Sequence, residues 1–338
     1  MENRYLGRTG VRVSPLTLGC MMFGGRTSLD DSCAMIDRAI DAGINVLDTA
    51  NVYSIGKSEE FTGEALNRNG HRDRIFLATK VHGNMHKDDK LHPSQWGNSR
   101  FGIIEQCHAS LKRLKTDRID LYQIHRPHPE CAIDETLQAL DDLVRQGKVR
   151  YIGSSTFAAW QVVESLWVSE KLGLNRFVTE QPPYHLLDRR IERELIPVCR
   201  TYGIGLIPWS PLAGGFLSGK YQKGQTPPAD SRFGDPKHMR AGMLTVDAAF
   251  TAVEKLSGLA KEKGVPLSQF ALAWCINQPG ITSPIIGPRT MEQLEDNLKA
   301  INIKITEEDC KAIDAICPPG EHVVSFYNAN FGPHPHRV

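Results

Sequence analysis

The chain has 338 residues, 41% hydrophobic and 23% charged, so it is long and apolar enough to bury a large core without disulfide or metal cross-links. Its 40 basic and 39 acidic residues give a net charge of +1, which excludes the basic surface of a typical nucleic-acid-binding protein. No run approaches the ~18 apolar residues of a membrane span, and no apolar secretory core opens the sequence, so we expect a cytoplasmic protein.

The N-terminal residues 5–13 form two short β-prone runs around a glycine-containing turn, which predicts a hairpin placed to close the floor of a barrel. After it, short apolar or β-branched runs alternate with amphipathic helical patterns. The predicted strands are residues 16–20, 44–48, 75–80, 119–125, 149–154, 177–181, 205–209 and 283–286. The predicted helices include residues 30–42, 102–114, 133–146, 158–171 and 291–300.

Eight strand–helix units favour an α/β fold of the (β/α)8 TIM-barrel type over the alternative, a doubly wound open sheet. The predicted strands begin about 28–31 residues apart, except for gaps of about 44 after the third strand and about 78 after the seventh. Both long connections would lie at the end of the barrel where the strands have their carboxyl ends, which we call the mouth. Barrel enzymes hold their active sites at this end. No linker divides the chain, so residues 1–338 are predicted to form one domain, with the tail from Pro318 folded back over the body.

The cysteines of the chain are scattered, and no two of the eight form a Cys-x-x-Cys pair. This spacing is typical of reduced thiols in a cytoplasmic protein and argues against a disulfide framework or a zinc ribbon.

Four ionisable residues fall at or just beyond the carboxyl ends of consecutive predicted strands: Asp48, Tyr53, Lys80 and His125. Each alone has an ordinary structural explanation, such as a turn cap, a lysine reaching water or a hydrogen-bonded core histidine. In a barrel, however, all four converge on one mouth. An ammonium beside a phenol makes the phenol a stronger acid, an aspartate holds that ammonium, and a histidine can hydrogen-bond a substrate oxygen. This set suits protonation of a carbonyl oxygen while a hydride reaches its carbon.

The same segments carry a family resemblance. Residues 43–59 (GINVLDTANVYSIGKSE) resemble the signature of the aldo-keto reductases, and residues 78–80 (ATK) and 120–125 (DLYQIH) resemble the following strand ends of that family. The resemblance covers nearly the whole chain, from Tyr5 to Gly287. It implies a barrel that reduces aldehydes or ketones with NADPH, with Tyr53 as the acid and Asp48, Lys80 and His125 completing a catalytic tetrad.

A cofactor site built from barrel loops is also implied, since no G-x-G-x-x-G turn indicates a Rossmann site. The resemblance assigns the nicotinamide end to Ser155, Thr156 and Gln181, with Trp209 stacking on the ring. Thr156 departs from the family's usual asparagine and carries one hydrogen-bond donor fewer. The other implied contacts are Gly19, Met21, Asp48, Ser210, Pro211, Leu212, Gly287, Gln293, Asp296 and Asn297.

Two further segments would hold the phosphates. Residues 214–220 (GGFLSGK) nearly spell a Walker A loop, but Tyr221 replaces the Ser or Thr that binds magnesium, which disfavours an NTPase. The resemblance implies instead that Gly214, Leu217, Gly219 and Lys220 cradle the cofactor pyrophosphate. Arg289 would grip a 2′-phosphate, which predicts NADPH as the cofactor.

Two other functions are weighed against this one. A regulatory protein with the same fold and cofactor but little turnover has precedent in the potassium-channel β-subunits of the family, although the intact tetrad argues against it. A metal hydrolase is suggested by clustered histidines: His82, His86, His92, His334 and His336. The first strand ends in Gly-Cys-Met rather than the His-x-His of barrel metal hydrolases, so we expect no metal site.

The predicted substrate pocket is lined by residues 21–23, Trp96, Arg126, the region 210–245 and the tail. Most of these residues are apolar, which favours a hydrophobic carbonyl compound, while Arg126 leaves an anionic substrate open. The expected partner is thus a small-molecule aldehyde or ketone, and the sequence defines neither the compound nor the oligomeric state. It also leaves open whether Cys20, at a position where the family often has threonine, is a reactive thiol.

Overall fold

A computed structural model describes residues 1–85, 92–234, 242 and 246–327 of the chain. Eight parallel strands form one sheet in the order β10-β3-β4-β5-β6-β7-β8-β9. They are β3 (Thr17–Gly19), β4 (Val46–Asp48), β5 (Phe76–Val81), β6 (Ile119–Ile124), β7 (Val149–Ser155), β8 (Phe177–Gln181), β9 (Gly205–Leu206) and β10 (Ile285–Ile286). The Ile285 N–H donates to the Pro208 carbonyl at 2.8 Å, so the two ends of the sheet meet and the predicted barrel closes.

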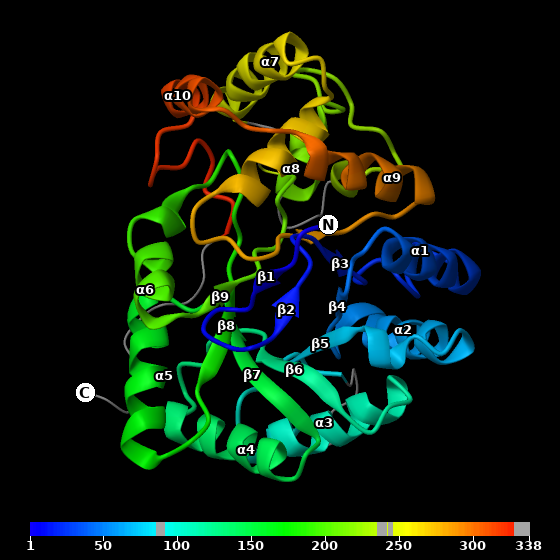
Figure 1. The fold of residues 1–338 in the computed structure, drawn as a ribbon, viewed down its shortest axis with the longest axis vertical. Helices are drawn as coiled ribbons and strands as arrows, with labels where there is room; N and C mark the ends of the chain where they lie inside the picture. The colour runs from blue at the N-terminus through cyan, green and yellow to red at the C-terminus, as the bar shows by residue number, and fades with distance from the viewer. Residues whose placement is uncertain (86–91, 235–241, 243–245, 328–338) are drawn as a thin grey trace.

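Helices surround these strands (Figure 1). They are α1 (Leu29–Asp41), α2 (Lys57–Arg68), α3 (Arg100–Arg113), α4 (Ile133–Arg145), α5 (Ala159–Leu172), α6 (Leu195–Tyr202), α7 (Asp247–Glu262), α8 (Leu267–Asn277), α9 (Met291–Lys299) and α10 (Glu307–Ile316). Helices α7 and α10 lie side by side at the outside (Figure 1). In α4, Leu137, Leu140, Leu143 and Val144 recur at helical spacing; the three leucines are fully buried and Val144 is half-buried. Gly147 follows the helix at φ +73°, a conformation typical of residues that end helices.

Four strands are at least two residues shorter than the sequence predicted, namely β3, β4, β9 and β10. Residues 205–209 and 283–286 contribute only the two-residue strands β9 and β10. A proline interrupts each run, Pro208 in the first and Pro284 in the second, and proline has no N–H to donate to a sheet. Their carbonyls still accept, Pro208 from Ile285 and Pro284 from Thr17 at 3.0 Å, so the barrel closes despite the short strands.

The N-terminal hairpin is confirmed, with β1 (Arg4–Tyr5) antiparallel to β2 (Arg12–Val13). Leu6 and Val13 are buried in one cluster with side chains from four barrel strands or their ends: Val46, Ala78, Leu121 and Ile207. The hairpin lies across the centre of the ring of strands in Figure 1 and closes the floor of the barrel. Gly7 allows this close approach, because a Cβ there would lie 2.4 Å from the Gly203 carbonyl oxygen.

Both long connections are present, the first between β5 and α3 and the second between β9 and α7. The second contains the short helices η5 (Ala213–Ser218) and η6 (Arg232–Gly234). The described part of the tail folds back as predicted: the Val323 N–H donates to the Leu187 carbonyl at 2.9 Å, and the Phe326 N–H donates to Asp188 Oδ2 at 3.2 Å. All eight cysteines are free thiols.

Across the described ranges, no helix has the length and apolar character required to cross a membrane.

Candidate active site

The four predicted catalytic residues come from three neighbouring strands. Asp48 is the last residue of β4, Lys80 lies near the end of β5, and His125 directly follows β6. The strands are in parallel register, with Asp48 opposite Ala78 and Lys80 opposite Gln123. Tyr53 begins the turn after β4, η1 (Tyr53–Gly56). All four side chains are therefore at the carboxyl end of the barrel, where the sequence placed them.

Lys80 is the centre of this group. Its Nζ donates to Asp48 Oδ2 at 2.5 Å, to the Thr49 carbonyl at 2.8 Å and to the Tyr53 hydroxyl at 3.3 Å. The side chain of Lys80 is fully buried. Burial disfavours its charged form, but the Asp48 carboxylate and the Tyr53 phenol outweigh that effect and raise the pKa of Lys80 above its ordinary value. A cation is thus held in contact with the phenol that is expected to give up a proton.

Asp48 is held by more than Lys80. Its Oδ1 accepts hydrogen bonds from Gln181 Nε2 at 2.9 Å and from Gln123 Nε2 at 3.2 Å. Gln181 Nε2 also donates to Gln123 Oε1 at 3.2 Å. Gln123 has no predicted role, although it precedes His125 by two residues and alternation along a strand puts both on one face. In this structure, Gln181 contacts the tetrad, and its predicted contact with a cofactor remains a prediction.

His125 completes the group beside Tyr53. The two rings are edge-on, with their centroids 5.6 Å apart. Burial lowers the pKa of His125 well below its ordinary value, and the charges of Lys80 and Arg126 lower it further. The imidazole is therefore neutral near pH 7 and carries one N–H that can donate to a substrate oxygen.

The turn that carries Tyr53 has an unusual backbone. Ser54 and Ile55 have φ of +48° and +52°, a region that β-branched residues such as isoleucine rarely enter. Behind the turn, Ser58 Oγ donates to the Cys20 carbonyl at 2.7 Å, and Glu59 pairs with Arg113 at 2.6 Å. The polar residues of the motif after Tyr53 thus anchor the start of α2 and fix the strained turn in place.

The predicted nicotinamide residues Ser155 and Thr156 lie at the end of β7. Ser155 Oγ donates to the Gln181 carbonyl at 2.8 Å, and Thr156 Oγ1 donates to the Ser155 carbonyl at 2.7 Å. Thr156 has φ +60°, which asparagine tolerates far better than threonine, so the departure from the family pattern adds backbone strain. Both side chains are buried and their hydroxyl protons are engaged within the protein.

Glu180 supports the same turn and is not among the predicted site residues. Its side chain is fully buried; Oε2 accepts from Ser154 Oγ at 2.5 Å and Oε1 from the Phe157 N–H at 3.1 Å. Burial raises the pKa of Glu180 to about 8, so the carboxyl is mostly protonated at pH 7. The sequence does contain a signal for this residue, a glutamate within a largely apolar strand. A glutamate at such a position is buried only when hydrogen-bonding or charged partners surround it.

Trp209, the residue predicted to stack on the nicotinamide, is covered by the tail. Its ring centroid is 5.8 Å from that of Phe326 and 5.5 Å from that of Tyr327. The following residues form the turn into η5: Ser210 at φ +57°, the buried Pro211 and the half-buried Leu212. The tail thereby forms one wall of the mouth beside the predicted nicotinamide position.

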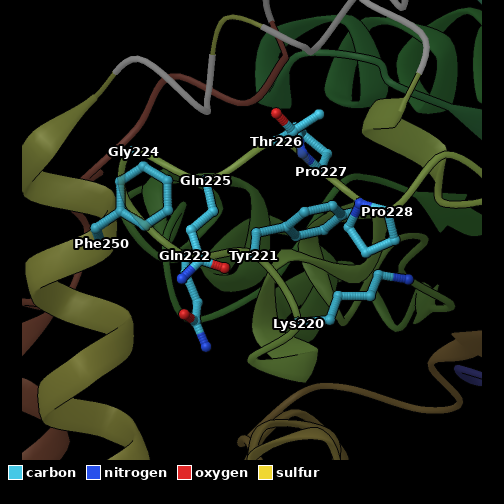
Figure 2. A pocket seen from close by; sticks show the side chains of 9 residues that line it. All are labelled: Lys220, Tyr221, Gln222, Gly224, Gln225, Thr226, Pro227, Pro228 and Phe250. Carbon is cyan, nitrogen blue, oxygen red and sulfur yellow. The ribbon is translucent and has the colours of Figure 1, made fainter.

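The predicted pyrophosphate loop forms η5 and the residues after it. Gly214, Gly215 and Gly219 all have positive φ, between +68° and +98°, and Leu217 is buried beneath them. The residues from Lys220 to Pro228 other than Lys223, together with Phe250 of α7, line a cavity of about 140 Å³ (Figure 2). Lys220 and Phe250 stand on opposite sides of it, and the Lys220 ammonium lies 5.3 Å from the Tyr221 ring.

Arg289 follows β10 and is paired with the second long connection. Its Nη2 donates to Asp230 Oδ2 and its Nη1 to the Asp230 carbonyl, both at 2.7 Å. The Arg289 hydrogen bond and charge, together with the charge of Lys220, lower the pKa of Asp230. The Arg289 guanidinium is therefore already paired with a carboxylate.

The remaining predicted cofactor residues lie at the same end of the barrel. Gln293 Oε1 accepts from the Arg289 N–H at 2.8 Å, whereas both Asp296 oxygens accept from the start of α8, from Ser268 and Gln269. Gly287 borders open space, and Asn297 is buried. At β3, a Cβ on Gly19 would lie 2.6 Å from Ile285, and Met21 is exposed. The cofactor roles of these residues stay predictions.

The structure also shows the surroundings of Cys20 and of two histidines that were candidates for a metal site. His82 hydrogen-bonds Asn98 at 2.9 Å, and the ring of His92 packs against Phe101, while His86, His334 and His336 lie outside the described residues. Within the part of the chain that the structure describes, no three His, Cys, Asp or Glu residues form a metal-binding group. Cys20 is fully buried, and burial raises the pKa of its thiol to about 12, so it is not a reactive thiolate.

Known proteins resemble this chain over nearly its whole length. The family model described as the aldo/keto reductase family matches residues 15–318. An uncharacterized oxidoreductase of Bacillus subtilis, YrpG, is 40% identical over 97% of this chain and 99% of its own. A probable voltage-gated potassium channel subunit beta of Oryza sativa is 37% identical, covering 94% and 96% of the two chains. The versiconal hemiacetal acetate reductase of Aspergillus parasiticus is 34% identical, covering 93% and 96%.

Proposed function

Since the chain belongs to the aldo/keto reductase family and is an NAD(P)H-dependent oxidoreductase, we propose that it reduces an aldehyde or ketone to the alcohol with NADPH, using Tyr53 as the proton donor. The observation that carries this proposal is the buried contact of one ammonium, on Lys80, with both Asp48 and the Tyr53 hydroxyl. A cation next to a phenol stabilises the charge that develops on the phenol as its proton leaves.

The residues at the mouth fit a dinucleotide with a phosphorylated ribose. Hydroxyl and amide groups of Ser155, Thr156 and Gln181 suit a carboxamide, and Trp209 offers an aromatic face. The glycine-rich turn 214–219 would approach the pyrophosphate with its backbone, beside Lys220. The Arg289 guanidinium, which here binds the Asp230 carboxylate, has the charge and donor geometry for a 2′-phosphate. When bound, NADPH supplies the hydride for the carbonyl carbon.

The proton transfer follows from the chain's own groups. Tyr53 gives its phenolic proton to the carbonyl oxygen as that oxygen becomes an alkoxide. The neutral His125 donates a hydrogen bond to the same oxygen and so orients the substrate. Asp48 balances the buried charge of Lys80, and the two glutamine amides of Gln123 and Gln181 hold Asp48 in the orientation that this requires.

A second function draws support from the comparisons. Two relatives described as probable potassium channel β-subunits are 37% and 36% identical to this chain over the aligned residues, which fits a regulatory protein that binds NADPH with little turnover. A steady-state assay with reactive aldehydes and ketones separates the two functions. We expect substrate-dependent NADPH oxidation with the alcohol as product. Tight NADPH binding without alcohol formation across the panel would favour the regulatory function.

A further inference from the structure

Arg126 is a cation at the mouth with no acidic partner in the part of the chain that the structure describes. It directly follows His125, and its Nη1 donates to the His125 carbonyl at 2.7 Å. Among the described residues, no carboxylate lies within ion-pair distance of its guanidinium, and this is the one hydrogen bond that the guanidinium donates. Arg189 and Arg190, near the same tail, are by contrast paired with Glu192 and Asp188. The Nε–Nη2 edge of Arg126 thus keeps its donors for another group.

Aromatic side chains fix the guanidinium in place. Its central carbon lies 5.9 Å from the Trp209 ring centroid and 5.2 Å from that of Tyr327. The tail that carries Tyr327 is itself held, because Arg190 Nη2 donates to the Tyr327 carbonyl at 3.0 Å. Cation–π contacts to two rings restrict a side chain that would otherwise move freely, and this preorganisation lowers the entropic cost of binding a ligand.

The cation also lies close to the reacting centre. Arg126 is next in sequence to His125, whose ring is edge-on to Tyr53, and Trp209 is the residue predicted to stack on the nicotinamide. An unpaired, half-buried cation costs free energy to desolvate, and that cost is offset when an anion binds. A planar carboxylate matches the free edge of a guanidinium that is bounded by flat aromatic rings.

We propose that Arg126 binds the carboxylate of the substrate, so that the enzyme acts on aldehydes or ketones that carry an acid group. This proposal rests on the proposed carbonyl reduction and names its substrate class. The apolar walls around Arg126 suit the hydrocarbon part of such a molecule, while the guanidinium orients it with its carbonyl toward Tyr53.

The test compares two aldehydes that differ only in charge, 4-carboxybenzaldehyde and methyl 4-formylbenzoate. We expect the wild-type protein to favour the acid in kcat/KM by about tenfold or more. Arg126→Met should remove that preference, so that the ratio of kcat/KM for the acid to kcat/KM for the ester falls to about one, while Arg126→Lys should restore part of it. Arg74→Met, which removes an exposed arginine before β5, is the control for net charge. Equal losses for acid and ester, or no loss for either, would overturn the proposal.

Binding without turnover separates this proposal from the proposed function. Calorimetric titration with benzoate, and with benzamide as the neutral comparison, should show benzoate binding that Arg126→Met weakens about tenfold or more and Arg74→Met leaves unchanged. This result would stand even if neither aldehyde were reduced, in which case the carbonyl reduction alone would fail. Benzoate binding that is equal in the wild type and Arg126→Met would overturn the anion site.

Discussion

At the scale of single residues, the Tyr53 hydroxyl can be removed without disturbing the ring that carries it. Tyr53→Phe keeps the ring contacts with His125 and Lys80, and Lys80 keeps its bonds to Asp48 and the Thr49 carbonyl. We expect kcat to fall by about 10²–10⁴, the usual contribution of a positioned acid. NADPH affinity should change by less than about threefold, or 0.65 kcal/mol. Steady-state assays of aldehyde reduction measure kcat, and fluorescence titration measures the affinity for NADPH. A kcat near the wild-type value would show that another group is the acid.

Lys80→Met tests the same chemistry but also the fold. Among the described residues, the substitution leaves the buried Asp48 carboxylate with only the two glutamine amides as partners. Losing one member of a buried ion pair costs about 3–5 kcal/mol, so we expect a marked fall in the unfolding temperature alongside the loss of activity. Thermal unfolding followed by circular dichroism measures the first effect. An inactive variant with unchanged stability would show that Asp48 is neutralised in another way.

Arg289 tests the cofactor preference. Arg289→Ala should weaken NADPH binding by at least about tenfold, or 1.4 kcal/mol, and leave NADH binding nearly unchanged, because only NADPH carries the 2′-phosphate. Asp230→Asn is the matched control: it removes the carboxylate that faces Arg289 but keeps the guanidinium, so NADPH binding should not weaken. Fluorescence titration with both cofactors measures the change. Equal losses for NADPH and NADH would mean that Arg289 does not contact the phosphate.

Individual residues show how far the sequence predicts the site. Asp48, Tyr53, Lys80 and His125 could be found because parallel strands put their carboxyl ends at one edge. Gln123 was overlooked although it lies on the same face of β6 as His125. The pairing of Arg289 with Asp230 had no local signal, because it joins residues 59 positions apart across a long connection. Glu180 could not be identified because its partners are distant in sequence: Ser154 belongs to the neighbouring strand β7, and Phe157 to the turn after it.

At the scale of elements, the loops at the mouth share an unusual backbone. Within the described residues, six non-glycine residues have positive φ, and five of them lie in the segments after β4, β7 and β9: Ser54, Ile55, Thr156, Ser210 and Ala213. Strain of this kind persists where the surrounding structure fixes it, and it concentrates at functional sites. Strand order and helix positions follow from the apolar pattern, whereas these strained turns do not, because their conformation is imposed by packing.

The turn around η5 and Lys220 is the element that distinguishes a nicotinamide site from a nucleotide hydrolase. If its glycines and Lys220 hold a pyrophosphate, NADPH should bind without magnesium, and Lys220→Ala should weaken that binding by about three- to tenfold. Titration of NADPH in the presence of EDTA measures this directly. Magnesium-dependent ATP hydrolysis that Lys220→Ala abolishes would contradict the assignment and favour the hydrolase.

At the scale of the whole molecule, Glu180 links stability to pH. The carboxyl of an unfolded glutamate ionises near pH 4.5, whereas burial raises the pKa of Glu180 to about 8. Between these values the folded state binds more protons than the unfolded state, so this group lowers the free energy of unfolding as the pH rises from about 4.5 to 8, and no further above that.

Glu180→Gln cannot ionise, and its amide can keep both neighbours, accepting from the Phe157 N–H and donating to Ser154 Oγ. The unfolding temperature of the variant, relative to the wild type, should therefore increase from pH 5 to pH 8 and then level off. Scanning calorimetry across this range measures the difference, with Glu105→Gln, an exposed glutamate of α3, as the control. Parallel curves for Glu180→Gln and the wild type would show that the carboxyl is ionised in the folded protein throughout this range.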